Sequence, residues 1–239
     1  MKKKKIQIFC TLGPASLNQK FLKYISKIKS VTLVRLNMSH IEIKNLKKII
    51  LFVKKYSSCP ICLDTEGAQI RTKIKKTILC KNGSLIKFKK KGGNFSLYPE
   101  EVFEKIQVGD VLDIGFDDLK AKVFKIKNSE IFLKTSSSGK LENNKGVNIS
   151  NRNIRLDYLT KKDLQAIIIA KKLKIKNFAL SFTNNKEDVF QFQKILPKEN
   201  KIFKIESKNA IKNLNDIIKH AKNFLIDRGD LSKEIKIEN

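Results

Sequence analysis

Short apolar runs alternate with amphipathic helical segments at both ends of this chain, and this alternation constrains its fold more than any other feature. Residues 6–11, 31–36 and 61–63 are apolar runs of strand length, and apolar residues at helical spacing lie between them, at 16–29 and 42–56. Strands that are joined through helices pair in parallel with right-handed crossovers. The sequence therefore predicts an α/β fold that begins β-α-β-α-β.

The middle of the chain has a different pattern of apolar and polar residues. From about residue 73, short segments alternate apolar and polar residues, and turns rich in glycine or serine separate them. Such alternation is typical of antiparallel strands, and it predicts a small all-β module of roughly 80 residues inserted after the third strand. The expected division is therefore residues 1–72 and 154–239 for the two parts of the α/β domain, with residues 73–153 as the insert.

The α/β rhythm returns near Thr160, which is expected to cap a helix, with Asp163 completing a capping box. Ser16 is expected to cap the first helix of the chain in the same way. Three more strands and two more helices follow the helix at Thr160; they are expected at 178–182, 186–196, 202–206, 210–222 and 224–227. The α/β part thus has six expected strands.

The formal charge of +28 raises the question of a nucleic-acid partner. The lysines are spread over every segment, however, and aromatic residues do not alternate with them as a stacking surface requires. We therefore expect diffuse solvated faces, with nucleic-acid binding as the residual hypothesis that a steep salt dependence would favour. The positive field would still attract phosphorylated substrates. No run approaches the length of a membrane helix, so a cytoplasmic protein with no membrane partner is expected.

The four cysteines include a CxxC pair, Cys59 and Cys62. This spacing occurs in redox and zinc sites. The sequence has no second closely spaced pair of cysteines or histidines to complete such a site. Both cysteines also flank an apolar run. Reduced, buried thiols are therefore expected.

Polar and charged residues follow directly after several of the expected strands. They form clusters at 34–40, 63–67, 203–206 and 226–230. The carboxyl ends of parallel strands are where α/β proteins build their active sites. The pattern indicates an enzyme, or the remains of one.

Two of these clusters suggest a divalent metal. Lys204 and Glu206 are one residue apart and project from the same face of a strand. Asp230 is placed to join Glu206 as a second carboxylate ligand, which is a Mg²⁺-type arrangement. Lys204 would then supply positive charge to an anion that develops beside the metal. The alternative is a structural ion pair followed by a Gly-Asp turn.

The other two clusters suggest an anion and a monovalent cation. The guanidinium of Arg35 suits a phosphate or a carboxylate. A set of oxygen donors from adjacent strands suits a loosely held monovalent cation; its members are Asn37, Ser39, Asp64 and Thr65. For Ser39 and Asp64 the alternative is helix capping and loop bonding.

In six ordered segments the chain resembles pyruvate kinase. The segments are 10–16, 34–40, 63–72, 145–148, 204–206 and 228–231. The resemblance implies a TIM-type (β/α) barrel with an inserted β-barrel lid domain. It also implies glycolytic phosphoryl transfer between phosphoenolpyruvate and ADP, giving pyruvate and ATP, with Mg²⁺ and K⁺.

The resemblance also implies a role for each matching residue. Lys204 would be catalytic, and Glu206 and Asp230 would hold Mg²⁺. Phosphoenolpyruvate would be bound by Arg35, Lys204, Gly229 and Asp230; K⁺ by Asn37, Ser39, Asp64 and Thr65; and the nucleotide by His40, Arg71 and Lys145.

Two departures from the family pattern limit these implications. The family's Lys-Gly-Pro-Glu reads Glu66-Gly67-Ala68-Gln69 here, which counts against K⁺. Six parallel strands also cannot close an eight-stranded barrel, and they leave open edges. A homo-oligomer or a complementing chain is expected to cover these edges. The alternatives to an active kinase are a catalytically reduced paralog that binds a phosphorylated ligand or a partner chain, and a Mg²⁺-dependent lyase or aldolase that acts on a pyruvate enolate.

Overall fold

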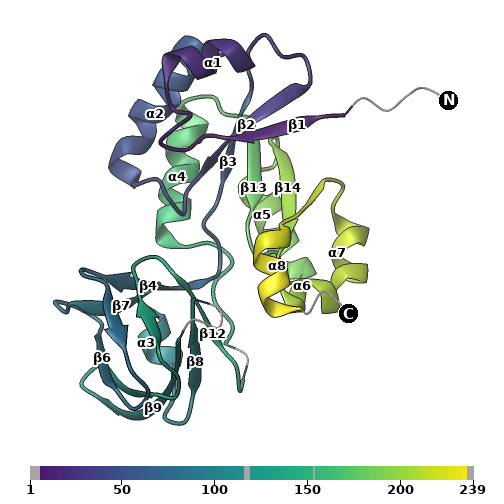
Figure 1. Ribbon diagram of the computed structural model, residues 1–239. Helices are drawn as coiled ribbons and strands as arrows, with labels where there is room; N and C mark the ends of the chain where they lie inside the picture. Colours follow the sequence, from purple (N-terminus) through teal and green to yellow (C-terminus); the bar gives the residue numbers. More distant parts are fainter. Residues whose placement is uncertain (1–5, 116–118, 153, 236–239) are drawn as a thin grey trace. The chain divides into compact units, whose positions relative to one another are not determined.

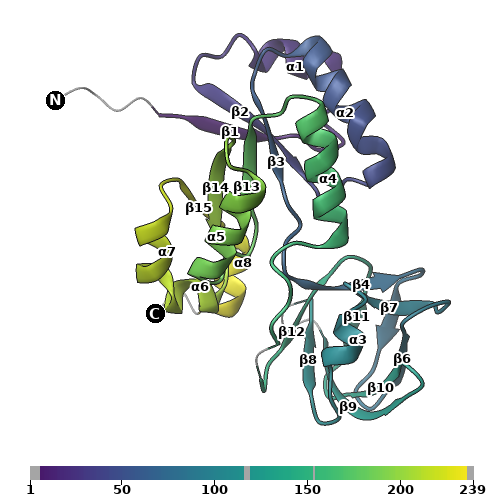
Figure 2. The same ribbon diagram turned by 180° about the vertical axis from the view of Figure 1, so that it is seen from behind.

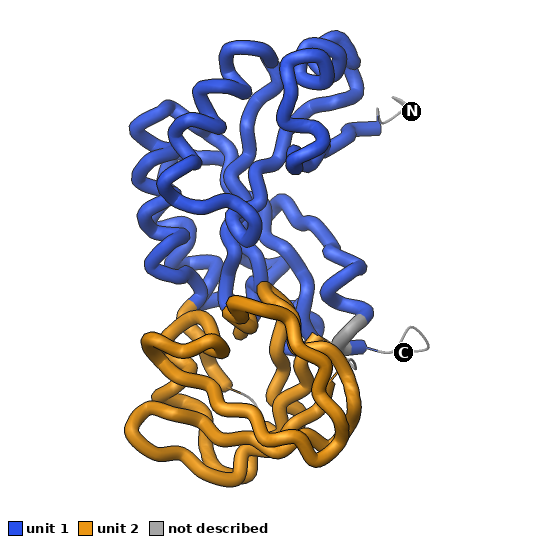
Figure 3. The backbone as a smooth tube through the Cα atoms, turned by 60° about the vertical axis from the view of Figure 1, so that its left-hand side comes forward, with its two compact units in different colours: residues 1–68, 158–239 blue, residues 69–157 orange. Residues whose placement is uncertain are grey.

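The computed structural model of the protein describes residues 6–115, 119–152 and 154–235. The chain divides into two compact units, residues 1–68 with 158–239 and residues 69–157 (Figure 3). The first unit joins the two α/β segments, and the second contains the β-rich insert. These boundaries lie a few residues from positions 73 and 153, where the texture of the sequence changes.

A parallel sheet forms the centre of the first unit, and the order of its strands in space follows their order in the chain (Figure 1). Among the described residues the strands are β1 (Ile8–Thr11), β2 (Val31–Asn37), β3 (Ile61–Asp64), β13 (Asn177–Leu180), β14 (Asn200–Ile205) and β15 (Phe224–Ile226). The sheet curls, with β1 and β15 as its two edges. This architecture is an incomplete TIM-type barrel and confirms the predicted fold class.

Helices follow the strands, and all but the last contribute residues to the core on one face of the sheet. They are α1 (Gln19–Ile25), α2 (Ile43–Tyr56), α4 (Lys161–Lys172), α5 (Lys186–Ile195), α6 (Lys208–Lys212), α7 (Leu214–His220) and α8 (Arg228–Glu234). Figure 2 shows α2 and α4 side by side on this face. The predicted capping box of α4 is present, because the Thr160 hydroxyl accepts from the amide of Asp163 and the Asp163 carboxylate accepts from the amide of Thr160. No helix of the described residues is both long enough and apolar enough to cross a membrane.

Alternation along the strands separates two apolar layers. In β14, Phe203 and Ile205 belong to the large core that the sheet shares with the helices. Ile202, one position away, packs on the opposite face with Leu33 and Cys62 of neighbouring strands. Because successive side chains point to opposite faces, Lys204 shares the face of Ile202. The face of the sheet opposite the helices therefore carries Ile202 and, near the carboxyl end of β14, the charged side chain of Lys204.

Two details of the predicted helices were wrong. The first helix is capped by Asn18, whose side chain accepts from the amide of Phe21. Ser16 instead accepts from the amide of Gly13 in the preceding turn. The single helix expected at 210–222 is broken into α6 and α7 at Asn213, whose side-chain amide donates to the carbonyl of Asn184 at 2.8 Å. Helical periodicity does not reveal such a tertiary contact.

The second unit is an antiparallel β-barrel. Its elements among the described residues are β4 (Ile70–Ile74), β5 (Ile78–Cys80), β6 (Leu85–Lys89), β7 (Phe95–Tyr98), α3 (Val102–Lys105), β8 (Val111–Ile114), β9 (Leu119–Lys127), β10 (Glu130–Thr135), β11 (Gly139–Leu141) and β12 (Gly146–Ile149). The main sheet has the order β6-β10-β9-β8-β12-β4-β7. Its end strands β6 and β7 lie next to each other, so the barrel is nearly closed.

Candidate active site

Polar side chains from neighbouring strands of the first unit converge at the carboxyl ends of those strands. They come from β2, β3, β14 and the residues that follow β13, β14 and β15, and the contacting groups are Arg35, Asp64, Ser181, Lys204, Glu206 and Asp227. Their backbones belong to strands that are hydrogen-bonded to one another, which sets their side chains at neighbouring positions. The clusters that the sequence places at strand ends therefore meet at one end of the sheet.

Lys204 lies at the centre of this group and is almost completely buried. Its ammonium nitrogen lies 2.5 Å from Glu206 Oε1 and 3.4 Å from both Asp64 Oδ2 and Asp227 Oδ2. It also donates a hydrogen bond to the Ser181 hydroxyl at 3.1 Å. Burial disfavours the charged form of Lys204, but the carboxylates of Asp64 and Glu206 outweigh it and raise the pKa of the ammonium. The charged ammonium form of Lys204 is therefore favoured.

Asp64 ties this lysine to the neighbouring strand β2. Its Oδ2 atom lies 3.2 Å from Arg35 Nε as well as near Lys204, and its Oδ1 atom accepts from the Ser181 hydroxyl at 3.2 Å. The carboxylate is fully buried. One negative charge is thus shared between two cations, which holds both cationic side chains in place.

Glu206 is also fully buried, and it has a different environment on each oxygen. Oε2 accepts from the backbone amide of Phe182 at 2.6 Å, and Phe182 has a φ of 53°, a left-handed conformation that is uncommon for a bulky residue. Oε1 faces the Lys204 ammonium as an ion pair but accepts no aligned hydrogen bond from the described residues. Burial raises the pKa of Glu206 to about 7 against the opposing effect of Lys204. A buried carboxylate at the carboxyl end of a parallel strand lies where α/β proteins bind their ligands.

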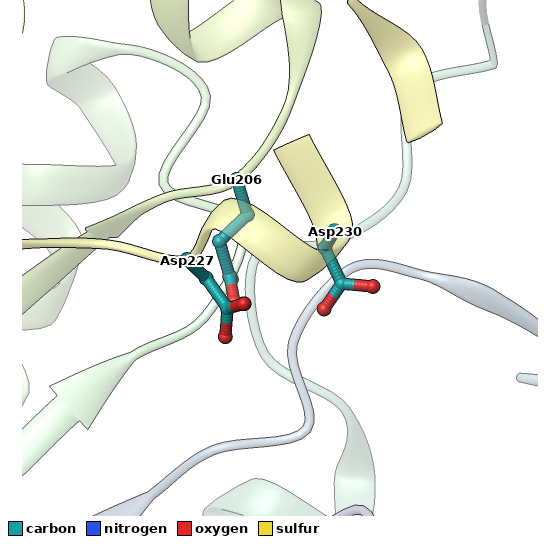
Figure 4. A group of neighbouring side chains, drawn as sticks. All are labelled: Glu206, Asp227 and Asp230. Atoms are coloured by element: carbon teal, nitrogen blue, oxygen red, sulfur yellow. The ribbon is translucent and has the colours of Figure 1, made fainter. Parts of the chain in front are cut away.

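Three carboxylates could hold a divalent cation. Oxygens of Glu206, Asp227 and Asp230 all lie within 4.8 Å of one another, and Figure 4 shows the three side chains converging from the end of β14 and the start of α8. Hard carboxylate oxygens are the ligands that Mg²⁺ prefers, and ligands of one ion at about 2.1 Å lie at most about 4.2 Å apart, so a small side-chain movement suffices. The donor set therefore fits Mg²⁺.

The predicted monovalent-cation set lies at the ends of β2 and β3. Asn37 Oδ1 accepts from the amide of Ser39 at 2.9 Å, and Thr65 Oγ1 accepts from the amide of Ser181 at 3.0 Å. Each of these oxygens keeps a further lone pair, so their chemistry admits K⁺. The charge of Asp64, however, is already balanced by Arg35 and Lys204, so the site does not require a further cation.

The loop after β3 is held by a second buried network, around Glu66. Glu66 Oε1 accepts from the Thr160 hydroxyl at 2.8 Å, and Oε2 pairs with Lys162 Nζ at 3.0 Å. Lys162 also donates to the carbonyl of Met38, and the Asp163 carboxylate accepts from the amide of Glu66. The negative charge at Glu66 is thus neutralised within the protein, and the N-terminal turn of α4 ties the β2 and β3 loops together.

Removing either partner of the Glu66–Lys162 pair is expected to destabilise the first unit. We expect Glu66→Gln and Lys162→Met each to lower the free energy of unfolding by about 1–3 kcal/mol, because each leaves a polar group in this network unsatisfied. The double variant should lose less than the sum, with a coupling of about 0.5 kcal/mol or more. Urea unfolding of the four proteins measures this. Lys161→Met, at an exposed neighbouring position, is the control, and additive losses would contradict the pairing.

The remaining predicted residues lie in the turn after β2, in α8 and in the second unit. His40 is exposed in the turn after β2, where its amide donates to the carbonyl of Asn37, and Gly229 lies in the first turn of α8. Arg71 and Lys145 belong to the second unit, where Arg71 is paired with Gly146 across β4 and β12. The Lys145 ammonium lies 3.0 Å from Glu142. The nucleotide-binding roles of His40, Arg71 and Lys145 stay predictions.

Sequence reasoning gave no site role to two members of the cluster, Ser181 and Asp227. Ser181 lies within the strand expected at 178–182, and Asp227 lies in the polar cluster at 226–230. The four cysteines form no disulfide, and of the CxxC pair Cys62 is buried as expected whereas Cys59 is only partly buried. Cys62 is buried in β3, and burial raises the pKa of its thiol. Thiolate chemistry at Cys62 is therefore disfavoured.

Comparisons with known proteins agree with the resemblance in the motifs. The sequence model of the family described as pyruvate kinase, barrel domain, matches residues 3–239. Pyruvate kinase of Staphylococcus haemolyticus (strain JCSC1435) is 31% identical over 255 residues, which cover 99% of this chain and 43% of that protein. Pyruvate kinase of Clostridium perfringens (strain 13 / Type A) is 31% identical over 253 residues, covering 98% of this chain and 53% of that protein.

A solved structure is similar over the same span. The crystal structure of Cryptosporidium parvum pyruvate kinase superposes with a TM-score of 0.86 at 26% sequence identity, and the match covers 98% of this chain and 54% of that one. The chain thus spans about half the length of the relatives that it matches.

Proposed function

This chain belongs to the pyruvate kinase family, and we propose that it carries the phosphoryl-transfer site of a kinase that converts phosphoenolpyruvate and ADP to pyruvate and ATP. In this reaction the bond between phosphorus and the enolate oxygen breaks, a bond from phosphorus to an ADP oxygen forms, and the enolate takes up a proton. Such chemistry depends on positioning and on neutralising charge rather than on a covalent intermediate with the protein.

The observation that carries the proposal is the buried ammonium of Lys204 among carboxylates at the ends of parallel strands. Because Lys204 is held by Asp64 and Ser181 on one side and by Glu206 on the other, its charge is positioned before substrate arrives. Preorganised charge of this kind stabilises negative charge that develops in a transition state. Arg35, fixed by the same Asp64, supplies a second cationic group for the substrate's phosphate or carboxylate.

Glu206 and Asp230 are the residues that we propose hold Mg²⁺. Oxygens of the two carboxylates lie within 4.8 Å of each other, and hard carboxylate oxygens are the ligands that Mg²⁺ prefers. When bound, the ion would neutralise negative charge on the phosphoryl oxygens and make the phosphorus more open to attack. For K⁺, the oxygens of Asn37, Ser39, Asp64 and Thr65 admit the ion, whereas Arg35 and Lys204 already balance the charge there. We therefore propose a requirement for Mg²⁺ and test K⁺ separately.

The direct experiment measures transfer from phosphoenolpyruvate to ADP by the purified protein. Pyruvate and ATP should both appear, and their formation should require Mg²⁺. Parallel reactions with K⁺ and with an inert monovalent cation such as tetramethylammonium test whether the K⁺ set is used. Protein that is folded by circular dichroism and yet forms neither product would contradict the proposal.

The open sheet edges support a second candidate, a catalytically reduced paralog that binds a phosphorylated ligand or a partner chain. Ile8 and Phe9 in β1 and Ile226 in β15 are exposed, with Ile226 at 65% of its full accessibility. Exposed apolar edge strands are sites at which further strands pair. We propose that additional β/α segments, from a second chain or from the same polypeptide, cover these edges and complete the barrel.

A further inference from the structure

We propose that Asp227 is a third carboxylate ligand of the divalent cation in this chain, in addition to Glu206 and Asp230. The inference rests on the proposed function for the choice of a divalent cation. Its subject is a residue to which the motif resemblance gives no role.

The position of Asp227 is set by the end of β15. Its backbone amide donates to the carbonyl of Ile205 at 3.2 Å, which continues the pairing of β15 with β14 by one residue. The carboxylate therefore lies beside Glu206, the residue that follows Ile205. Figure 4 shows the Asp227 and Glu206 carboxylates next to each other, with Asp230 directed toward the same space.

A capping role does not account for the Asp227 carboxylate. Asp227 is the N-cap residue of α8, where an aspartate normally accepts a hydrogen bond from an amide of the first turn. Here the side chain makes no such bond. It faces Lys204 instead, at 3.4 Å.

Pairing with Lys204 alone does not account for it either. The cluster contains two cationic side chains, Arg35 and Lys204, and their charge already faces the buried carboxylates of Asp64 and Glu206. Asp227 therefore adds a further negative charge beside Glu206, and oxygens of Glu206, Asp227 and Asp230 lie within 4.8 Å of one another. A divalent cation bound among them would balance this added charge and contact all three carboxylates.

The number of carboxylates determines how strongly a site holds its ion in the absence of substrate. Mg²⁺ in phosphoryl-transfer enzymes is usually held by one or two carboxylates together with substrate phosphates, and affinity rises with the number of charged ligands. A third carboxylate makes the ion less dependent on the phosphates. It also reduces the positive charge that remains for an anionic substrate.

The test is a titration of Mn²⁺, as a spectroscopic substitute for Mg²⁺, into the whole protein without substrates. Free Mn²⁺ is followed by electron paramagnetic resonance. We expect one site that Mg²⁺ displaces, and we expect Asp227→Asn to weaken it by roughly tenfold or more, as loss of a charged ligand does. Asp216→Asn removes an exposed carboxylate on α7 and should leave the affinity unchanged.

Two results would overturn the inference: wild-type protein that binds no Mn²⁺, or Asp227→Asn protein that binds it as tightly as wild type. A thermal unfolding curve of each variant confirms that it is folded. The Mn²⁺ titration is repeated with Asp227→Ala, which removes the carboxylate without introducing the side-chain amide of asparagine. Mn²⁺ binding is measured independently of phosphoryl transfer. Mn²⁺ binding that depends on Asp227 in a protein without phosphoryl transfer would support the ligand and contradict the kinase.

Discussion

Replacing Lys204 with alanine is expected to have the largest effect on activity of any single substitution in this protein. Removing one preorganised charge from a transition state costs about a hundredfold to a thousandfold in turnover. The substitution also leaves the buried carboxylates of Asp64 and Glu206 without their shared cation, and breaking a buried ion pair costs about 3–5 kcal/mol of stability. Steady-state transfer from phosphoenolpyruvate to ADP and urea unfolding measure the two effects.

The control for this prediction is Lys198→Ala, which removes an exposed lysine from the turn before β14. Both activity and stability should remain close to those of the wild-type protein. Lys204→Met keeps most of the side-chain volume and separates lost charge from lost packing. Folded Lys204→Met protein with wild-type turnover would rule out a catalytic role for this lysine.

Gly67→Ala is expected to be the most destabilising substitution in the loops around the site. Gly67 has a φ of +69°, and a Cβ atom there would lie 2.6 Å from the carbonyl oxygen and 2.9 Å from the Cβ of Ser181. Backbone cannot yield as a flexible side chain does, so the loss should exceed about 3 kcal/mol, combining strain with overpacking. Activity should fall as well, because Ser181 bonds both Asp64 and Lys204.

Gly92→Ala is the matched control for the clash at Gly67. Gly92 has nearly the same φ, +71°, but nothing lies within 4 Å of an added Cβ atom. Its cost should therefore be the conformational strain alone, about 1–2 kcal/mol. Thermal or urea unfolding of the two variants compares them, and equal losses would contradict the proposed contact with Ser181.

The alternation of strands and helices could be predicted from the sequence because the local signals agreed with the fold. The helix at 42–56 and the capping box at Thr160 are examples, since their signals lie within one segment. Several strands of the second unit were not anticipated, including β4 and β12. These short strands contain few apolar residues, and their partners are distant in sequence.

The site could be predicted only in part, for a related reason. The shared face of Lys204 and Glu206 follows from the period of a strand, and the distance of 2.5 Å between their charged atoms agrees with it. The contribution of Asp227 depends on the pairing of β15 with β14, which sequence spacing does not specify. The left-handed backbone of Phe182, which directs its amide to Glu206, has no signal in the residue type.

The insert also has a consequence for the order in which the chain folds. β3 and β13 pair directly, yet the whole second unit lies between them in the sequence. Within that unit, β4 pairs with β12, and Thr72 bonds Lys145 through its amide, so the two ends of the insert lie close together. Closing a loop costs entropy that rises with the logarithm of its length. If the insert folds first, it shortens the effective loop between β3 and β13, and it thereby lowers the entropy cost of pairing these two strands of the parallel sheet.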